Sequence, residues 1–514
     1  MVQDIYDPLT EYINVFRNRF KQVAEETFAE LAAEAHVDVE ANRDTCRLLY
    51  QAENDLSSVK TRRAWWKVGC VLLWLSVMAE VLVAILCAEE KEFPLFMTLI
   101  VAGTLTTLFL LLRVHPRLNQ LKSEQNEVKT KVNALKKKAW EQMTPLNRLY
   151  DWDVLTRMMS KTVPRLEFDP YFTTQRLADL KMTYNWNDSF NSKRSVVYSH
   201  SGLINGNPFV ICRTKKMQMG TKTYYGKKSI SWTTRERGSD GRYRTVHHSE
   251  VLKASVTAPY PLYIEKTRLI YGNTAAPDLI FYRKKSGLAG KEDSLSFKWK
   301  KYSLRKKARN LSNADFAMMT NEEFEVAFNT SNRNNNQQFA LLFTPLAQES
   351  MLKLLENKED GYGDDFDFHK NKMINTIIPD HMQELNLDMN PSQYRHFDYD
   401  KAKVDFYAIN ARYFRAIYFS LAPLLCVPMY QQIRPLHDIY GRDMQRQSSF
   451  WEHEALANFW GQQHFKHPSC VTECILKTEQ IERSDDSATI SVYAYGYRTE
   501  QRVTHIRKWG GDGN

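Results

Sequence analysis

Glu80 is the residue of this chain with the clearest chemical potential, because it lies in the middle of an apolar run from Val68 to Ala88. A carboxylate within such a run is costly and often functional. A second apolar run, Leu95 to Leu112, follows closely, so Glu80 is expected to face Val101 and Thr104 and to bond the Thr104 hydroxyl in its protonated form. This placement predicts either an ion-coupled step, which requires an oligomer or partner, or a neutral side chain held by Thr104 or by another protomer.

Five possible zinc ligands occur close together near the C-terminus: His453, His464, His467, Cys470 and Cys474. Imidazole and thiolate groups are good zinc ligands, but a His-Glu-x-x-His run and a Cys-x-x-Cys pair are both absent. The cluster therefore predicts either a metal-dependent hydrolase or a packed helix that carries two ordinary cysteines.

Residues 200 to 310 hold 24 Lys and Arg against 7 Asp and Glu, a net charge of +17 in a chain of net charge +10. Such a surface attracts anionic lipid or an acidic protein partner; the alternative is a solvated basic face. Aromatic residues are interleaved, but no nucleic-acid motif accompanies them, so nucleic acid is not expected. The predicted anion-binding residues are Lys215, Lys216, Lys227, Lys228, Arg235, Arg237, Arg242, Arg244, Arg305, Lys306 and Lys307.

Motifs for nucleotide cofactors and for nucleophilic catalysis are absent, which argues against an enzyme, and no cofactor is expected. The seven cysteines are odd in number and irregular in spacing. They suggest no disulfide framework and agree with a reducing, cytoplasmic location.

The two apolar runs are each long enough to cross a bilayer core of roughly 30 Å, so residues 64–113 predict a transmembrane helical hairpin. Basic residues flank the hairpin on its outer sides, whereas the connecting loop is acidic. By the positive-inside rule, both termini and the main domain are expected in the cytoplasm, with two passes through the membrane.

Apolar residues at three- and four-residue steps predict helices on both sides of the hairpin, over residues 1–63 and 114–163. The second helix carries a heptad seam with Gln125 and Gln142 as polar positions, and Pro145 is expected to disrupt it. Pairing of the two helices would form an antiparallel coiled-coil stalk; packing on the soluble body or on another copy is the alternative.

Residues 164–384 predict a cytosolic α+β domain with a mostly antiparallel sheet, and residues 385–514 an α+β extension. Arg235 to Arg244 is expected as an exposed hairpin tip, residues 321–328 as a helix or strand, and Phe339–Phe343 as a strand. A helix is expected over 345–356 and a hairpin over 366–378. Residues 413–430 predict a buried, proline-broken helix rather than a third span, and the run from Ala488 a strand.

Three phrases carry a family resemblance: Met319-Thr-Asn-Glu-Glu-Phe-Glu-Val-Ala-Phe-Asn-Thr, then Phe339-Ala-Leu-Leu-Phe-Thr-Pro345, then Met351-Leu-Lys-Leu-Leu. They resemble an uncharacterised bacterial membrane-anchored family, domain of unknown function 3137, most clearly over 319–355. The chain departs from that pattern at Phe343, where Leu is usual, and over 332–338, where a more acidic turn is usual. The resemblance implies two close spans followed by a cytosolic α+β domain, and no activity.

Together these features predict a membrane-anchored α+β protein: a two-span transmembrane hairpin, a coiled-coil stalk and a cytosolic sheet domain with packed helices. The expected function is a scaffold or binding module that self-associates within a larger inner-membrane assembly. The expected partners are the bilayer, further copies or another assembly protein, and possible anionic lipid. The alternatives are an ion-coupled transport subunit that uses Glu80 and a hydrolase that uses the cluster over 453–474.

Overall fold

The protein is described by a computed structural model, whose chain divides into two compact units. The helical unit comprises Lys21–Val154 and Asn390–Ala411, and the sheet unit comprises Met1–Phe20, Leu155–Met389 and Arg412–Asn514. The structure describes residues 4–89, 93–188, 193–237, 239, 241–309, 316–388, 390–435, 447–484, 487–500 and 505.

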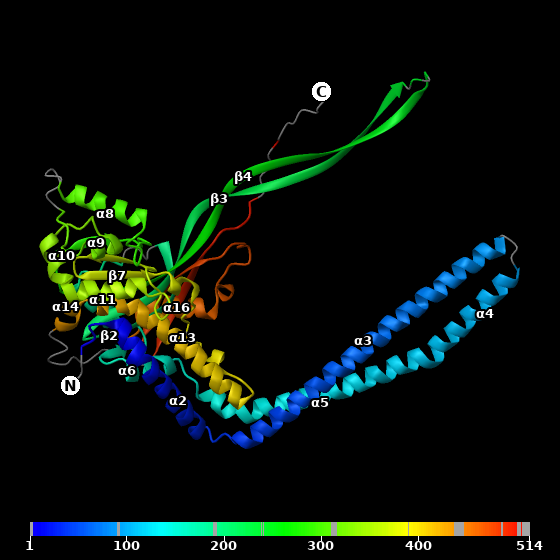
Figure 1. The fold of residues 1–514 in the computed structure, drawn as a ribbon, viewed down its shortest axis with the longest axis horizontal. Helices are drawn as coiled ribbons and strands as arrows, with labels where there is room; N and C mark the ends of the chain where they lie inside the picture. Colours follow the sequence, from blue (N-terminus) through cyan, green and yellow to red (C-terminus); the bar gives the residue numbers. More distant parts are fainter. Residues whose placement is uncertain are drawn as a thin grey trace. The chain divides into compact units, whose positions relative to one another are not determined.

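Two long helices dominate the helical unit and run side by side, as the blue and cyan ribbons of Figure 1 show. Among the described residues, two helices, Val39–Val83 and Met97–Leu149, are long and apolar enough to cross a membrane, and they include most of the two predicted spans. The helices of this unit are α2 (Arg17–Glu34), α3 (Val39–Glu89), α4 (Phe93–Phe109), the π-helix η2 (Leu110–Val114), α5 (His115–Leu149), η5 (Pro391–Tyr394) and the first part of α13 (Tyr399–Leu425).

The predicted seam of α5 faces α3. Leu49 and Ala52 of α3 pack against Val132 of α5. The polar seam positions also bond across the pair, since Arg63 donates to Gln125 at 2.6 Å and the Gln142 amide donates to a carbonyl of α3 at 3.3 Å. The side-by-side pairing of the two flanking helices is therefore present, while the coiled coil itself stays a prediction.

The expected break at Pro145 is wrong, because α5 continues through it to Leu149. Proline removes one backbone donor, but tertiary contacts hold the last turn in place. Met143 and Leu146 are buried, and the Asn147 side chain bonds both the carbonyl and the amide of His396. The helix ends where Tyr150 turns to extended backbone.

The sheet unit contains a seven-stranded antiparallel sheet in the order β1-β2-β3-β4-β7-β6-β5, and a separate β8-β9 pair. This confirms the expected mostly antiparallel sheet with helices. The strands are β1 (Leu166–Phe168), β2 (Arg194–Ile204), β3 (Asn207–Arg237), β4 (Tyr243–Gly272), β5 (Ile280–Arg283), β6 (Phe366–Asn371), β7 (Ile374–Pro379), β8 (Ile475–Arg483) and β9 (Ala488–Tyr495).

Helices cover this sheet, and an aromatic core lies beneath them. Trp451 of α16 is fully buried in a cluster with Val196 of β2 and Phe172. The helices are α1 (Pro8–Glu11), η1 (Tyr12–Phe16), α6 (Val154–Thr162), α7 (Thr174–Ala178), η3 (Asp179–Thr183), α8 (Leu295–Ala308), α9 (Glu322–Phe328), α10 (Asn336–Leu342), α11 (Pro345–Glu356), α12 (His381–Glu384), α14 (Pro428–Gln432), α16 (Phe450–Trp460) and η6 (Gln462–His464), together with the rest of α13.

Residues 339–343 were expected as a strand, and this prediction is wrong. They belong to α10, whose N-terminus is capped by the Asn335 side chain on the Gln338 amide, and to the residue after it. Phe339, Leu342 and Phe343 are all fully buried, which the three- and four-residue steps of a helix permit and the alternation of a strand does not. A five-residue apolar run does not distinguish the two by itself.

Several other local predictions are confirmed. The helix α11 spans the predicted residues, with Thr344 as its cap and Pro345 at its first turn. β6 and β7 form the predicted hairpin, and residues 322–328 form a helix. The segment 413–430 is largely buried and divides into α13 and α14, and β9 lies where the final alternating run predicted a strand.

Candidate functional site

The strands β3 and β4 extend far beyond the rest of their sheet as a two-stranded ribbon, drawn in green in Figure 1. We define the ribbon as residues 217–237 and 243–263, whose pairing runs without a bulge from Met217–Tyr263 to Arg237–Tyr243. At about 3.3 Å per residue, it is roughly 65 Å long. Among the described strands, β3 pairs with β2 only as far as Lys216, and β4 pairs with β7 only from Leu269. Both outer edges of the ribbon therefore lack a neighbouring strand.

The two faces of the ribbon differ in chemistry, because side chains alternate along each strand. One face is apolar and aromatic, and large side chains on it remain substantially exposed: Trp232 by 40%, Tyr224 by 49% and Leu262 by 46%. Cross-strand ring contacts occur on this face, for example between Trp232 and His248. The apolar face comprises Tyr224, Ile230, Trp232, Val246, Leu252, Val256, Tyr260 and Leu262.

The opposite face is rich in Thr and Ser, notably around Thr233, and also carries the exposed side chains of Met219, Tyr225, Tyr243 and Val251. Thr223 and Thr257 share a hydrogen bond of 3.0 Å across the two strands on this side. The whole segment 217–263 carries eight Lys and Arg against three Asp and Glu, a net charge of +5. The ribbon is thus amphipathic and basic. Described residues contact it at its base, where Tyr497 lies against Met217 and Thr472 against Tyr263, and cover no part of its apolar face.

The predicted anion-binding residues lie in three places of the sheet unit. Lys227, Lys228, Arg235 and Arg237 are on β3 of the ribbon, Arg244 is on β4, and Arg242 lies in the turn between them, which confirms the exposed basic tip. Lys215 and Lys216 stand at the base. Lys215 is engaged by Glu265 at 3.2 Å and by Glu473 at 2.7 Å.

The other three predicted cations belong to α8, not to the ribbon. Arg305 pairs with Glu322 at 2.6 Å, and Lys307 donates to the Ser331 carbonyl and lies over the Phe316 ring. Lys306 is exposed on the same helix. Two of these three cations, Arg305 and Lys307, are therefore engaged by groups next to α8.

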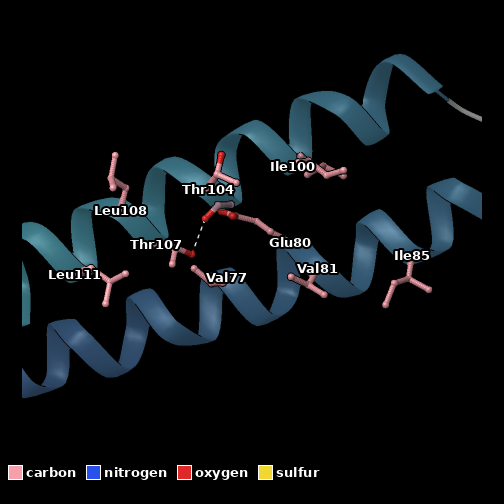
Figure 2. A pocket seen from close by; sticks show the side chains of 11 residues that line it. Val77, Glu80, Val81, Ile85, Ile100, Thr104, Thr107, Leu108 and Leu111 are labelled. Atoms are coloured by element: carbon pink, nitrogen blue, oxygen red, sulfur yellow. Dashed lines mark hydrogen bonds between the residues drawn. The ribbon is translucent and has the colours of Figure 1, made fainter.

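Glu80 is half-buried and lines a groove of about 520 Å³ between α3 and α4. Figure 2 shows its side chain reaching from α3 to α4 beside Thr104 and Thr107. The Thr106 hydroxyl lies 3.4 Å from the Glu80 carboxyl oxygen, whereas the Thr104 hydroxyl donates to the Val101 carbonyl at 2.8 Å. The expected bond to Thr104 is therefore replaced by one with Thr106.

Gly103 makes this approach possible. A Cβ atom on Gly103 would stand 3.3 Å from the Glu80 carboxyl oxygen, so the absence of a side chain leaves room for the carboxyl against α4. Sequence reasoning missed both Gly103 and Thr106. The helical step of three from Gly103 to Thr106 is shared by Val101 and Thr104, so this spacing does not tell which pair faces Glu80.

The five predicted metal ligands are not gathered into one site in the part of the chain that the structure describes. His453 bonds Ser448 at 2.9 Å, His467 bonds Ser469 at 2.7 Å, and His464 is exposed on η6. Only Cys470 and Cys474 lie together, with their sulfurs 3.6 Å apart.

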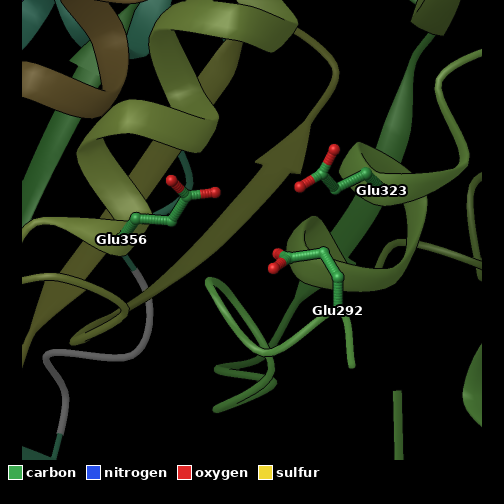
Figure 3. Close-up of side chains that lie close together, drawn as sticks. All are labelled: Glu292, Glu323 and Glu356. Carbon is green, nitrogen blue, oxygen red and sulfur yellow. The ribbon is translucent and has the colours of Figure 1, made fainter. Parts of the chain in front are cut away.

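Sequence reasoning missed a trio of surface carboxylates. Glu292, Glu323 and Glu356 come from the segment before α8, from α9 and from the end of α11 (Figure 3), and their oxygens lie within 4.8 Å of one another. Burial and a hydrogen bond with Glu292 raise the pKa of Glu323. Surface acids of this kind are common without an ion, so the trio alone defines no metal site.

A polar pocket of about 390 Å³ on the sheet is a further feature without a sequence signal. Arg194 of β2, Arg268 of β4 and His369 of β6 line it. Burial lowers the pKa of His369 to about 4, so this imidazole is neutral at pH 7, while the two guanidinium groups remain charged. Paired guanidinium groups suit a carboxylate or phosphate. Four strands, β2, β4, β6 and β7, and the segment 185–187 build this pocket from distant parts of the sequence.

Comparison of the chain with protein-family models, with curated proteins and with solved structures found no match. The resemblance over residues 319–355 therefore stays a prediction. Among the candidate sites described above, the ribbon is the most extensive.

Proposed function

We propose that this chain is a membrane-anchored binding module that docks an acidic partner protein on the β3–β4 ribbon. The observation that carries the proposal is the ribbon itself, an amphipathic two-stranded structure whose apolar face and outer edges are uncovered among the described residues. A two-stranded hairpin alone is marginally stable in water, and contiguous exposed apolar surface commonly marks an interaction site.

The chemistry of the ribbon favours a protein over a lipid surface or a nucleic acid. Its outer edges offer backbone donors and acceptors that another extended chain satisfies by adding a strand. A lipid headgroup does not satisfy such a row of groups. The net charge of +5 favours a partner of opposite charge, which also speeds encounter.

The anchor is the second part of the proposal. The two helices that are long and apolar enough to cross a membrane support a two-pass protein. Their basic flanks and acidic loop support both termini and the sheet unit in the cytoplasm, at the inner membrane of a bacterium. The resemblance to the membrane-anchored family also supports this location. Self-association of the spans would place several ribbons in one assembly.

The proposal is tested by site-specific photocrosslinking of the full chain in its native membrane. A photoreactive residue in place of Trp232 on the apolar face is expected to give one discrete crosslink to an acidic protein. The same residue in place of Thr233 is the matched control, because it lies one position along the strand on the opposite, polar face and is expected to give none.

The crosslink at Trp232 is expected to weaken as salt is raised, because the contact is partly electrostatic. Crosslinks to lipid alone, to a second copy alone, or equally from both positions would contradict an acidic partner on the apolar face.

A second candidate, an ion-coupled subunit, is favoured by the Glu80 carboxyl in the groove between α3 and α4. Glu80→Gln is then expected to abolish proton flux in vesicles that contain the full assembly, because an amide takes the place of the carboxyl but cannot exchange its proton. Flux is read with a pH-sensitive dye at matched protein abundance. Thr104→Val is the control, since the bond that the structure describes for the Thr104 hydroxyl lies within its own helix, to the Val101 carbonyl. Equal flux in wild type and Glu80→Gln would remove this candidate.

A further inference from the structure

Cys470 and Cys474 are the one pair of thiols in contact among the described cysteines, with their Sγ atoms 3.6 Å apart. Cys474 is only 1% exposed, whereas Cys470 is half-buried and thus reachable from solvent. The other described cysteines are each buried and unpaired: Cys46, Cys70, Cys212 and Cys426. An S–S bond is about 2.05 Å long, so the two sulfurs need to close by roughly 1.5 Å to form one.

Backbone contacts fix the turn that holds the two thiols. The Cys470 amide donates to the His467 carbonyl at 2.9 Å, and the Cys474 amide donates to the Gln462 side chain at 2.7 Å. The amide of Val471, which follows Cys470, donates to the Tyr497 carbonyl at 3.0 Å. The sulfurs are therefore held together by the fold and not by chance approach of a loose loop.

Gly496 packs directly over both sulfurs. A Cβ atom at this position would stand 2.4 Å from the Cys470 sulfur and 2.9 Å from the Cys474 sulfur, which no real side chain permits. The backbone of residue 496 thus encloses the pair on one side, and the absence of a side chain leaves the sulfurs room to meet.

The two thiols differ in acidity in the manner of an attacking and a resolving cysteine. Burial opposes ionisation of Cys470, but hydrogen bonds with Thr472 and Cys474 and the charge of Lys466 outweigh it, so its pKa lies below the ordinary value. Burial and the bond with Cys470 raise the pKa of Cys474 to about 11. The more exposed sulfur is therefore the better nucleophile.

We propose that Cys470 and Cys474 form a reversible redox site that a low-molecular-weight disulfide such as oxidised glutathione converts to an intrachain disulfide. The Cys470 thiolate attacks one glutathione sulfur and releases the other glutathione as a thiolate, leaving a mixed disulfide. Cys474 then loses its proton to solvent and attacks the Cys470 sulfur, releasing the second glutathione. Two protein thiols are oxidised to one disulfide, and one glutathione disulfide is reduced to two thiols.

The test uses the full chain in detergent, equilibrated with glutathione buffers of graded oxidised fraction, quenched with acid, alkylated and digested with trypsin. Cleavage after Lys466 and Lys477 places both cysteines, and no other, on one peptide. As the oxidised fraction rises, we expect this peptide to pass from a doubly alkylated form to an unalkylated disulfide form. The disulfide form is two hydrogen atoms lighter than the same peptide with two free thiols. Dithiothreitol is expected to restore the doubly alkylated form on renewed alkylation.

The same titration in concentrated urea measures the contribution of the fold. Because the folded chain holds the sulfurs together, its equilibrium constant for disulfide formation is expected to exceed that of the unfolded chain by about tenfold or more. Equal constants, or a peptide that stays doubly alkylated at every buffer ratio, would overturn the proposal.

Two variants separate the roles of the thiols. Cys474→Ser is expected to stop at a glutathione adduct on Cys470, since no resolving thiol remains, whereas Cys470→Ser is expected to leave Cys474 unmodified in the folded chain. Cys212→Ser is the matched control, because Cys212 is buried alone, and its titration should follow the wild type. A glutathione adduct on Cys474 in the Cys470→Ser variant would contradict the assigned order.

Discussion

Replacing Arg333 with Met is expected to lower the free energy of unfolding by about 3–5 kcal/mol, since it leaves a buried carboxylate without its partner. Arg333 is 3% exposed and Glu325 is 1% exposed, and two bonds of 2.6 and 3.0 Å join their side chains. The guanidinium also lies over the rings of Phe316 and Phe339, at 4.7 and 4.2 Å from their centroids. Removal therefore costs ring contacts as well as the ion pair.

Urea unfolding of the full chain in detergent, followed by tryptophan fluorescence and circular dichroism, measures this effect. Arg305→Met is the control, because Arg305 forms a comparable pair with Glu322 on the exposed surface of α8. Its unfolding midpoint is expected to match that of the wild type. Equal shifts of the unfolding midpoint in the two variants would show that the buried Arg333–Glu325 pair contributes no more to stability than the exposed Arg305–Glu322 pair.

The free energy of unfolding is expected to rise with pH between about 7 and 10 through a single buried amine, that of Lys370. Lys370 is 1% exposed, and its ammonium group donates to the carbonyls of Ala275 and Lys372. Burial lowers the pKa of Lys370 to about 7, whereas that of an unfolded lysine is about 10.4. In this window the unfolded chain binds a proton that the folded chain does not, so each rise in pH favours the folded state.

Lys370→Met isolates this contribution. From pH 7 to pH 9, the wild type is expected to gain roughly 2–3 kcal/mol of stability relative to the variant, at about 1.4 kcal/mol per pH unit. The measurement is the difference between the two unfolding free energies at each pH, so that other titrating groups cancel. Parallel stability curves would mean that Lys370 keeps an ordinary pKa in the folded chain.

Features that depend on near neighbours in the chain could be predicted from the sequence. The two apolar runs lie in α3 and α4, because a run of apolar residues specifies a long helix wherever it occurs. The helix α11 and the hairpin β6–β7 were predicted for the same reason, since a Thr-Pro cap and an Asn-Lys turn act locally.

Features that depend on packing between distant segments could not be predicted from the sequence. The apolar run at 339–343 is a helix because its side chains fill an aromatic core, and α5 passes through Pro145 because Asn147 bonds His396. Glu80 meets Thr106 and not Thr104 because the rotation of α4 against α3, which no single helix encodes, decides which face is turned inward.

The sequence by itself determined the candidate membrane spans, the basic character of residues 200–310 and some of the strands, among them those of the hairpin tip at Arg235 to Arg244 and of the hairpin over 366–378, since composition and alternation are local properties. Only the tertiary structure decided that two of these strands pair into one long amphipathic ribbon, that Arg333 is buried with Glu325, and that the Cys470 and Cys474 thiols lie in contact. Strand register and the enclosure of a side chain are set by residues far apart in the chain, so no local pattern specifies them.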